Sequence, residues 1–285
     1  MHYLIGKLAY LIAVKRKGNR MAAELMTTAV CWDMDMKVSA RFARDNKDFF
    51  YFCPDCLEKV DAKISERGNF FFRAPNKHQE GCANEKAQSD DSAVSGERRR
   101  EPAYVPPPLT PSHLGKIALP RKKNQPSPDE MRELVNKIKA APVLNPGTLA
   151  EVVDAWSSMT VSERHQTPLS IAGQLLNYFT AFAEINPFEK NVSSLGCDRV
   201  ITYTQATISF SSRGALVVTW RKFSTQNKPV PIRAEMAVSD PAVKGLTKGQ
   251  HVKLFLHGPA PTLNADQTYF EMQNANEYSG FIVRV

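Results

Sequence analysis

Apolar and polar side chains alternate along residues 24 to 52, and the alternation ends in an aromatic run at positions 49 to 52. The main apolar positions are Val30, Trp32, Val38 and Phe42. Alternation with a period of two is typical of strands that bury one face. We therefore predict short strands over this stretch, leading directly into the sequence Cys-Pro-Asp-Cys at 53 to 56.

The spacing of apolar residues becomes helical between residues 127 and 185. Ser127 and Pro128 suit the start of a first helix, which Pro142 ends. A second helix is predicted over Thr148–Met159 and a third over Pro168–Ile185. The apolar positions of the first and third helices are Met131, Leu134, Val135 and Ile138, and then Ile171, Leu175, Leu176, Phe179 and Phe182. Such a stripe predicts a face turned to the core.

The period returns to two after Cys197. The strand-like segments are Val200–Tyr203, Ala215–Trp220, Val252–Leu256 and Phe281–Val283, with Gly, Pro and Asn residues between them. This pattern predicts an antiparallel β domain of about five strands. A barrel, including one of the OB (oligonucleotide-binding) type, and a sandwich fit the pattern equally well.

The net charge of the chain indicates what kind of partner it binds. The chain has 37 Lys and Arg against 29 Asp and Glu, a net charge of +8 and a pI near 9.2. A basic protein favours an anionic partner such as nucleic acid. The apolar run Leu8–Val14 is too short to span a bilayer, and the basic cluster Lys15–Lys17 follows it, the reverse of a secretory signal. We predict neither export nor a membrane partner, and Met21 is an alternative start.

The four cysteine and histidine positions between residues 53 and 82 have the spacing of a metal site. Cys53 and Cys56 form a CxxC turn, and His78 and Cys82 follow it. Soft thiolate and imidazole ligands select tetrahedral zinc, and four protein ligands close the site, so we predict a structural rather than a catalytic Zn²⁺. The alternative is a chance CxxC beside an unrelated histidine. Cysteines used in this way fit a reducing cytoplasm better than a disulfide framework.

Together these features predict an α+β, multidomain chain. Its segments are an N-terminal extension (1–23), a small zinc-binding β-hairpin module (24–84), a disordered linker (85–127), a short helical segment (128–190) and an antiparallel β domain (191–285). The hairpin is predicted from the Gly68-Asn69 turn between apolar runs. The linker is predicted from its Ser, Asp, Glu, Arg and Pro content, which cannot form a core. A length of 285 residues agrees with about two domains.

The sequence Tyr51-Phe52-Cys53-Pro54-Asp55-Cys56, the hairpin, the aromatic Phe70-Phe71-Phe72-Arg73 and the later His and Cys resemble the N-terminal zinc-finger-like region of CoiA-like competence proteins. The resemblance covers only residues 28 to 84. It implies a context of processing or recombining incoming DNA. The nuclease domain of the longer family members has no counterpart here, because the Glu-Lys pairs at 85–86 and 189–190 lack the expected spacing.

Two groups of residues are candidates for nucleic-acid contact. The first consists of basic residues in and near the linker: Arg73, Arg98, Arg99, Arg100, Arg121, Lys122 and Lys123. Such charges neutralise phosphates, although a solvated linker explains them equally. The second mixes aromatic and basic groups in the β domain: Tyr203, Trp220, Arg221 and Lys222. Single-strand-binding barrels stack bases on such aromatics, while the alternative is a β core.

We therefore predict a cytoplasmic, zinc-containing accessory protein that binds nucleic acid, and DNA in particular. The alternative is a protein–protein adaptor with a structural zinc finger and no nucleic-acid contact. The sequence contains no Walker loop, dinucleotide glycine fingerprint or nucleophile motif, so we predict a non-enzymatic role. His113, His165, His251 and His257 are scattered without a neighbouring carboxylate pair, and Cys197 is predicted to be a buried thiol.

Overall fold

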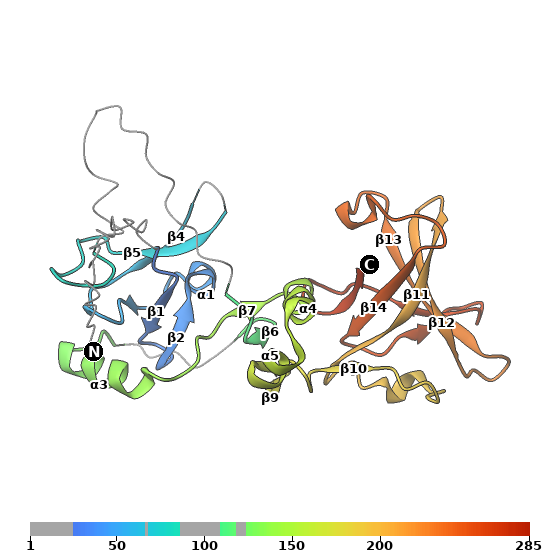
Figure 1. Ribbon diagram of the computed structural model, residues 1–285, viewed down its shortest axis with the longest axis horizontal. Helices are drawn as coiled ribbons and strands as arrows, with labels where there is room; N and C mark the ends of the chain where they lie inside the picture. Colours follow the sequence, from blue (N-terminus) through green and yellow to red (C-terminus); the bar gives the residue numbers. More distant parts are fainter. Residues whose placement is uncertain (1–24, 66–67, 86–108, 118–123) are drawn as a thin grey trace, which may run out of the picture.

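The computed structural model describes residues 25–65, 68–85, 109–117 and 124–285. Two lobes lie side by side, the first built around the Cys/His residues and the second around a curled sheet, with a small helical and β layer between them (Figure 1). The α+β prediction is confirmed. The predicted extension at 1–23 lies outside the described residues. Among those described, no helix is both long and apolar enough to cross a membrane.

The first lobe is built on a three-stranded antiparallel sheet. Its strands are β1 (Thr28–Cys31), β2 (Met36–Ser39) and β3 (Tyr51–Phe52), in the order β2-β1-β3. A short helix that the sequence pattern did not reveal, α1 (Ala40–Asp45), is capped by Ser39 and buries Phe42. The hairpin of β4 (Asp61–Ile64) and β5 (Phe70–Arg73) packs on the same core, which also contains four of the five cysteines. The predicted strands and hairpin are therefore present.

The first predicted helix, α3 (Pro128–Ile138), is confirmed. Ser127 caps it and Glu130 completes the capping box. Its apolar side chains Met131, Leu134 and Ile138 pack against Val30, Trp32 and Phe52 of the first sheet. Helix α3 follows the predicted linker in the sequence, but it packs in the Cys/His lobe. This lobe therefore extends across the predicted boundaries at 84 and 128.

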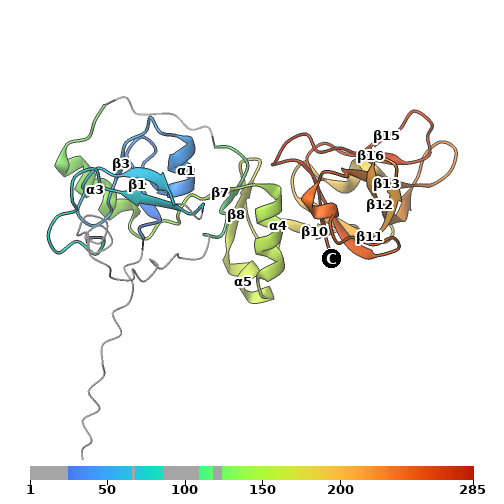
Figure 2. The same cartoon turned by 90° about the horizontal axis from the view of Figure 1, so that it is seen from above.

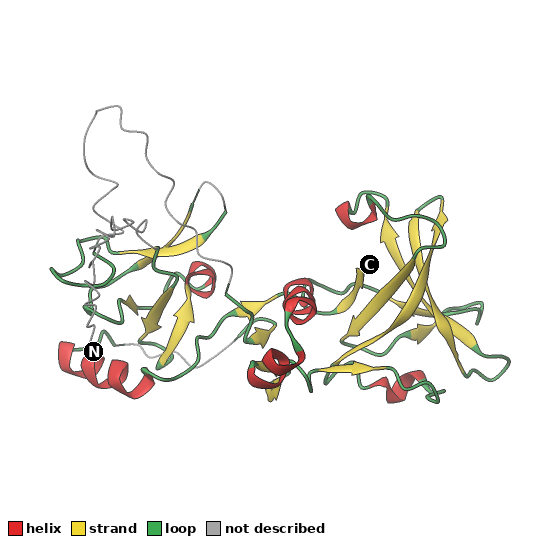
Figure 3. Ribbon diagram, in the orientation of Figure 1, coloured by secondary structure: helices red, strands yellow, loops and turns green. Residues whose placement is uncertain are grey.

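The middle layer is a four-stranded sheet with two helices, shown as mixed red and yellow in Figure 3. Its strands, in the order β7-β6-β8-β9, are β7 (Pro146–Gly147), β6 (His113–Leu114), β8 (Pro168–Ile171) and β9 (Gln174–Asn177). The helices are α4 (Leu149–Ser158), which confirms the second predicted helix, and α5 (Val161–Gln166). Strand β6 falls inside the predicted linker, most of which lies outside the described residues.

The third predicted helix, over Pro168–Ile185, is wrong. Ala172 and Gly173 both have positive φ, 50° and 79°, and form the two-residue turn of a hairpin between β8 and β9. Such a turn requires a left-handed backbone and matches the twist of paired strands, so it terminates any helix here. The rest of the segment forms β10 (Phe182–Glu184), which pairs in parallel with the second lobe.

The second lobe is one curled sheet that encloses a single core. Strands β11 (Ile201–Ser211), β12 (Gly214–Phe223) and β13 (Val230–Ala237) form an antiparallel meander, and β14 (His251–His257) pairs with the free side of β11. Short 3-10 turns occupy Val192–Leu195 and Pro241–Val243. In Figure 2 the strands follow one another around a ring.

Strands that follow one another in the sequence lie toward opposite ends of this sheet. Strand β16 (Phe270–Met272) runs parallel to β13, and β17 (Gly280–Arg284) runs antiparallel to β14, while β15 (Thr262–Leu263) pairs with β16. The bend between β16 and β17 depends on Gly280. Its φ is 132°, and a Cβ there would lie 2.2 Å from Asn274 Oδ1. Only glycine fits this approach without strain.

Helix α4 joins the two lobes. Trp156 stacks on Phe182 with ring centroids 4.8 Å apart and contacts Tyr203 and Phe255 of the second lobe. Asp154 accepts two hydrogen bonds from Arg284, of 2.6 and 3.0 Å. On its other side Glu151 pairs with Arg41 of the first lobe. The helix therefore covers part of the outer side of the curled sheet and leaves the rest open.

A buried histidine in this sheet predicts loss of stability in acid. His257 is 8% exposed, and burial lowers its pKa below the usual value. The unfolded chain then takes up a proton near pH 6.5 while the folded chain does not, so stability is full above that pH and falls as the pH drops toward the folded-state pKa. We expect urea unfolding of His257→Gln to show a shallower loss of stability from pH 7.5 to 5.5 than wild type, by up to about 1.4 kcal/mol per pH unit. Identical slopes in both proteins would contradict this role.

Candidate metal centre and nucleic-acid interface

Two tight turns position the four predicted metal ligands. In the first, the Cys53 N–H donates to Glu58 O and the Leu57 N–H donates to Cys53 O, at 2.8 and 3.0 Å. Leu57 has a φ of 61°, a conformation that usually requires glycine, and its side chain is held against the core of α3. In the second turn, the Cys82 N–H donates to Gln79 O at 3.0 Å. Both cysteine turns therefore aim their thiols at one point.

The ligand atoms have the separations of a tetrahedral site. The sulfur atoms of Cys53 and Cys82 are 3.8 Å apart. His78 Nδ1 lies 3.2 Å from Cys56 Sγ and 3.7 Å from Cys82 Sγ, and all four ligand atoms lie within 4.8 Å of one another. A tetrahedron with metal–sulfur bonds of about 2.3 Å has edges of about 3.8 Å. Cys53, Cys56, His78 and Cys82 thus form a cluster that could bind one metal ion.

All four ligands are buried, and burial disfavours the charged form of each side chain. Burial raises the pKa of Cys82 to about 12, raises that of Cys53 and lowers that of His78. These shifts favour neutral thiols and a neutral imidazole. Three buried thiolates would be costly by themselves, so a cation is the partner that compensates their charge, and its binding releases protons.

Asn84 supplies hydrogen bonds to the cluster from the side. Its backbone N–H donates to Cys82 Sγ and its Nδ2 to Cys53 Sγ, both at 3.4 Å. Asp55 accepts from the Ala83 N–H at 2.7 Å and so ties the first turn to the second. Donors of this kind orient metal ligands and spread the charge of thiolates. The sequence spacing did not identify Asn84 or Asp55, because only the fold brings both turns together.

Comparison with known proteins finds no matching family model, curated protein or solved structure.

The residues predicted to contact nucleic acid divide into three groups. Arg98, Arg99, Arg100, Arg121, Lys122 and Lys123 lie outside the described residues. Arg73 is exposed at the end of β5, in the other lobe from Tyr203, Trp220, Arg221 and Lys222. Trp220 and Lys222 are exposed, whereas Tyr203 is half-buried against α4. Arg221 donates to the carbonyls of Pro187 and Glu189, which makes it a structural clamp on that loop.

Other strands bring further polar and basic side chains beside Trp220. Its indole Nε1 donates to Thr207 of β11, and its ring meets His251 of β14 edge-on at 4.7 Å. Lys253, two positions along β14, lies 6.0 Å from the Tyr203 ring. We call Tyr203, Thr207, Trp220, Lys222, His251 and Lys253 the outer surface. Thr207, His251 and Lys253 were missed by sequence reasoning. Thr207 and His251 lie outside the predicted strands, and only Lys253, between Val252 and Leu254, had a usable signal in its outward parity.

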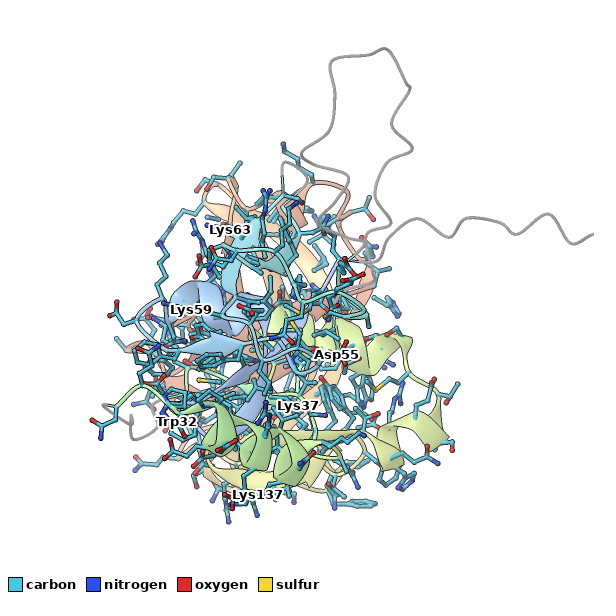
Figure 4. The ribbon with its side chains drawn as sticks, turned by 90° about the vertical axis from the view of Figure 1, so that its left-hand side faces the viewer. Trp32, Lys37, Asp55, Lys59, Lys63 and Lys137 are labelled. Atoms are coloured by element: carbon cyan, nitrogen blue, oxygen red, sulfur yellow. The ribbon has the colours of Figure 1, made fainter. Side chains whose placement is uncertain are left out.

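Charge is unevenly divided between the lobes. Residues 191–285 have ten Lys and Arg against six Asp and Glu, whereas residues 24–84 have nine against ten. Figure 4 looks onto the first lobe, where Lys37, Lys59, Lys63 and Lys137 are spread over the face with Asp55 among them. The second lobe therefore has the stronger basic character of the two.

Proposed function

We propose that this chain is a zinc-containing, non-enzymatic protein that binds single-stranded nucleic acid, and DNA in particular, through the outer surface. The observation that carries the proposal is Trp220, which is 54% exposed and edge-on to His251. Lys222 lies two positions from it along β12, and Lys253 lies two positions from His251 along β14. An exposed indole is costly to leave in water and offers a stacking face to any base. Neighbouring lysines attract the phosphates that connect stacked bases.

The strand arrangement supports this reading. Strands β11, β12 and β13 form a meander, and the fourth strand, β14, pairs with the free side of β11. The last segment is parallel to β13 through β16 and antiparallel to β14 through β17. This is the order of a five-stranded OB-type barrel, in which the last strand is here broken into β16 and β17. Barrels of that type bind oligonucleotides on the face of the second and third strands and on adjoining loops, and Trp220 and Lys222 lie on the second strand, β12.

The Cys/His centre has a different role in the proposal. Three thiolates and one imidazole select Zn²⁺, and four protein ligands leave no open position for a substrate. The charge balance of the first lobe also gives it little attraction for phosphates by itself. We assign to zinc the folding of this lobe, in a reducing compartment such as the cytoplasm. The resemblance to CoiA-like proteins is the support for DNA over RNA.

Binding to labelled single-stranded and duplex DNA over a salt series tests the proposal. We expect Trp220→Ala to weaken single-strand binding about 5- to 150-fold, since one stacked base contributes about 1–3 kcal/mol. Lys222→Gln and Lys253→Gln should each reduce the slope of log K against log salt by about 0.7. Phe179→Ala, which removes an aromatic ring of similar exposure on the middle layer, is the matched control.

The adaptor alternative has one specific observation in its favour. Val161, Leu175 and Phe179 are 60%, 78% and 47% exposed around α5 and β9, and β9 is the edge strand of its sheet. Exposed apolar groups at a sheet edge suit a protein partner. Two results together would favour the adaptor function over nucleic-acid binding. The first is no DNA binding at low salt, and the second is salt-insensitive binding to a protein partner that is lost in Phe179→Ala.

A further inference from the structure

A cleft of about 420 Å³ opens at one end of the curled sheet. Three separate segments form it: the residues before β11, the loop between β12 and β13, and the loop that carries β15 and β16. Its lining consists of Asn191, Val192, Ser193, Ser224, Thr225, Gln226, Ala260, Pro261, Leu263, Gln267 and Phe270. This volume lies in the range of small-ligand sites, about 300–1,000 Å³.

The lining chemistry restricts what the cleft can hold. Its apolar part includes Val192, which is buried, and Phe270, which packs edge-on against the core ring of Phe223. The remaining side chains are hydroxyls and amides, and none of the lining residues carries a charge. A phosphate would have no positively charged side chain to pair with among the lining residues. The ligand that fits is therefore neutral, has a flat face to pack against the apolar wall, and has both hydrogen-bond donors and acceptors.

The amides are placed to pair with such a group. Gln267 Oε1 accepts from Asn227 at 2.9 Å, which orients this amide and leaves its NH₂ group as a donor. Gln226 is exposed at the rim. Amide side chains present a donor and an acceptor side by side, the arrangement that pairs with the edge of a nucleobase.

The cleft lies at the end of the strand that carries the outer surface. Strand β12 contains Trp220 and Lys222 and ends at Phe223. Ser224, which lines the cleft, follows immediately. At about 3.3 Å per residue, Trp220 and Ser224 are about 13 Å apart along the strand. A nucleic-acid strand stacked on Trp220 and following Lys222 is thereby led toward the cleft.

We infer that this cleft is a pocket for one unstacked nucleobase of the bound strand, and that it gives the protein a preference among bases. The inference rests on the proposed function, since the outer surface delivers the strand. Trp220 supplies stacking that every base can satisfy, whereas amide contacts to a base edge discriminate between bases.

The test compares eight-nucleotide homopolymers of dA, dC, dG and dT with the zinc-loaded full-length protein. We expect wild type to prefer its best base over its worst by about ten-fold or more, and Gln226→Ala/Gln267→Ala to reduce this ratio to within about two-fold at an unchanged salt slope. Gln174→Ala, an exposed amide on β9, is the matched control and should keep the preference. A wild type without preference, or a preference that survives in the double variant, overturns the pocket.

A second arm separates this outcome from failure of the proposed function. Titration with the four phosphate-free nucleosides, followed by amide NMR shifts, should show saturable changes at residues 224–226 that resist salt and persist in Trp220→Ala. Nucleoside binding without oligonucleotide binding would sink the outer surface and keep the pocket. Oligonucleotide binding with no nucleoside-induced shift at these residues would contradict the pocket but not the outer surface. Saturable binding of a neutral oligosaccharide, but of no nucleoside, would overturn the assignment of the cleft to a base.

Discussion

Replacement of both Cys53 and Cys82 by serine is expected to abolish metal binding and unfold residues 53–85. The four ligands join two turns that are otherwise linked by few contacts, such as the Asp55 to Ala83 hydrogen bond. Binding of a structural Zn²⁺ contributes on the order of 10 kcal/mol in isolated fingers, more than the whole stability of many small domains. Metal analysis should give one zinc per wild-type chain and none in the variant, and amide exchange should become fast across 53–85.

The matched control is Cys31→Ser. Cys31 is fully buried in β1, where burial raises its pKa to about 12, but it lies outside the cluster. This variant should lose some packing and retain the metal. The curled sheet should keep its slow exchange in all three proteins, because its core shares no residue with the metal-binding lobe. Wild-type exchange rates at 53–85 in the metal-free double variant would contradict a structural role for the ion.

The parts of the fold that sequence predicted correctly have signals confined to a few neighbouring residues. The helix starts at Ser127 and Thr148 each have a cap and a glutamate three residues later, and the structure shows both capping boxes. The metal ligands are marked in the same way, by a CxxC and a later His and Cys whose residue types are rare enough to be selective. Strands β11, β12 and β14 were visible because buried positions alternate with less buried ones over part of each strand.

The failures occur where distant segments decide the outcome. Leu175 and Phe179 fell on an apolar helical stripe but are 78% and 47% exposed, because the Ala172-Gly173 turn places Leu175 on strand β9 of a hairpin and Phe179 in the turn after it. Strand β6 pairs with β7 and β8, which follow it by more than 30 residues, and no local pattern marks it. The outer surface likewise needs β11, β12 and β14 in register, so only Trp220, Lys222 and Tyr203 were found from sequence.

The second large effect is expected from Trp156→Ala. Trp156 is 7% exposed and is surrounded by the rings of Phe182, Tyr203 and Phe255, with the Arg164 guanidinium 4.0 Å from its ring. Truncation of a buried aromatic of this size costs about 3–5 kcal/mol. Far-UV circular dichroism during urea unfolding should show a lower midpoint, and a separate early transition if α4 detaches from the curled sheet.

Trp220→Ala is the natural comparison, because the same chemical change is made at a 54% exposed position on strand β12 of the sheet that Trp156 of α4 packs against. It should alter stability by less than about 1 kcal/mol while weakening single-strand binding, whereas Trp156→Ala should mainly lower stability. Trp156 packs from α4 onto the covered part of the outer face, against Tyr203 and Phe255, whereas Trp220 lies on the open part of that face. If the open tryptophan proved equally important for folding, its exposure would have a structural cause and the outer surface would lose its claim to be a binding site.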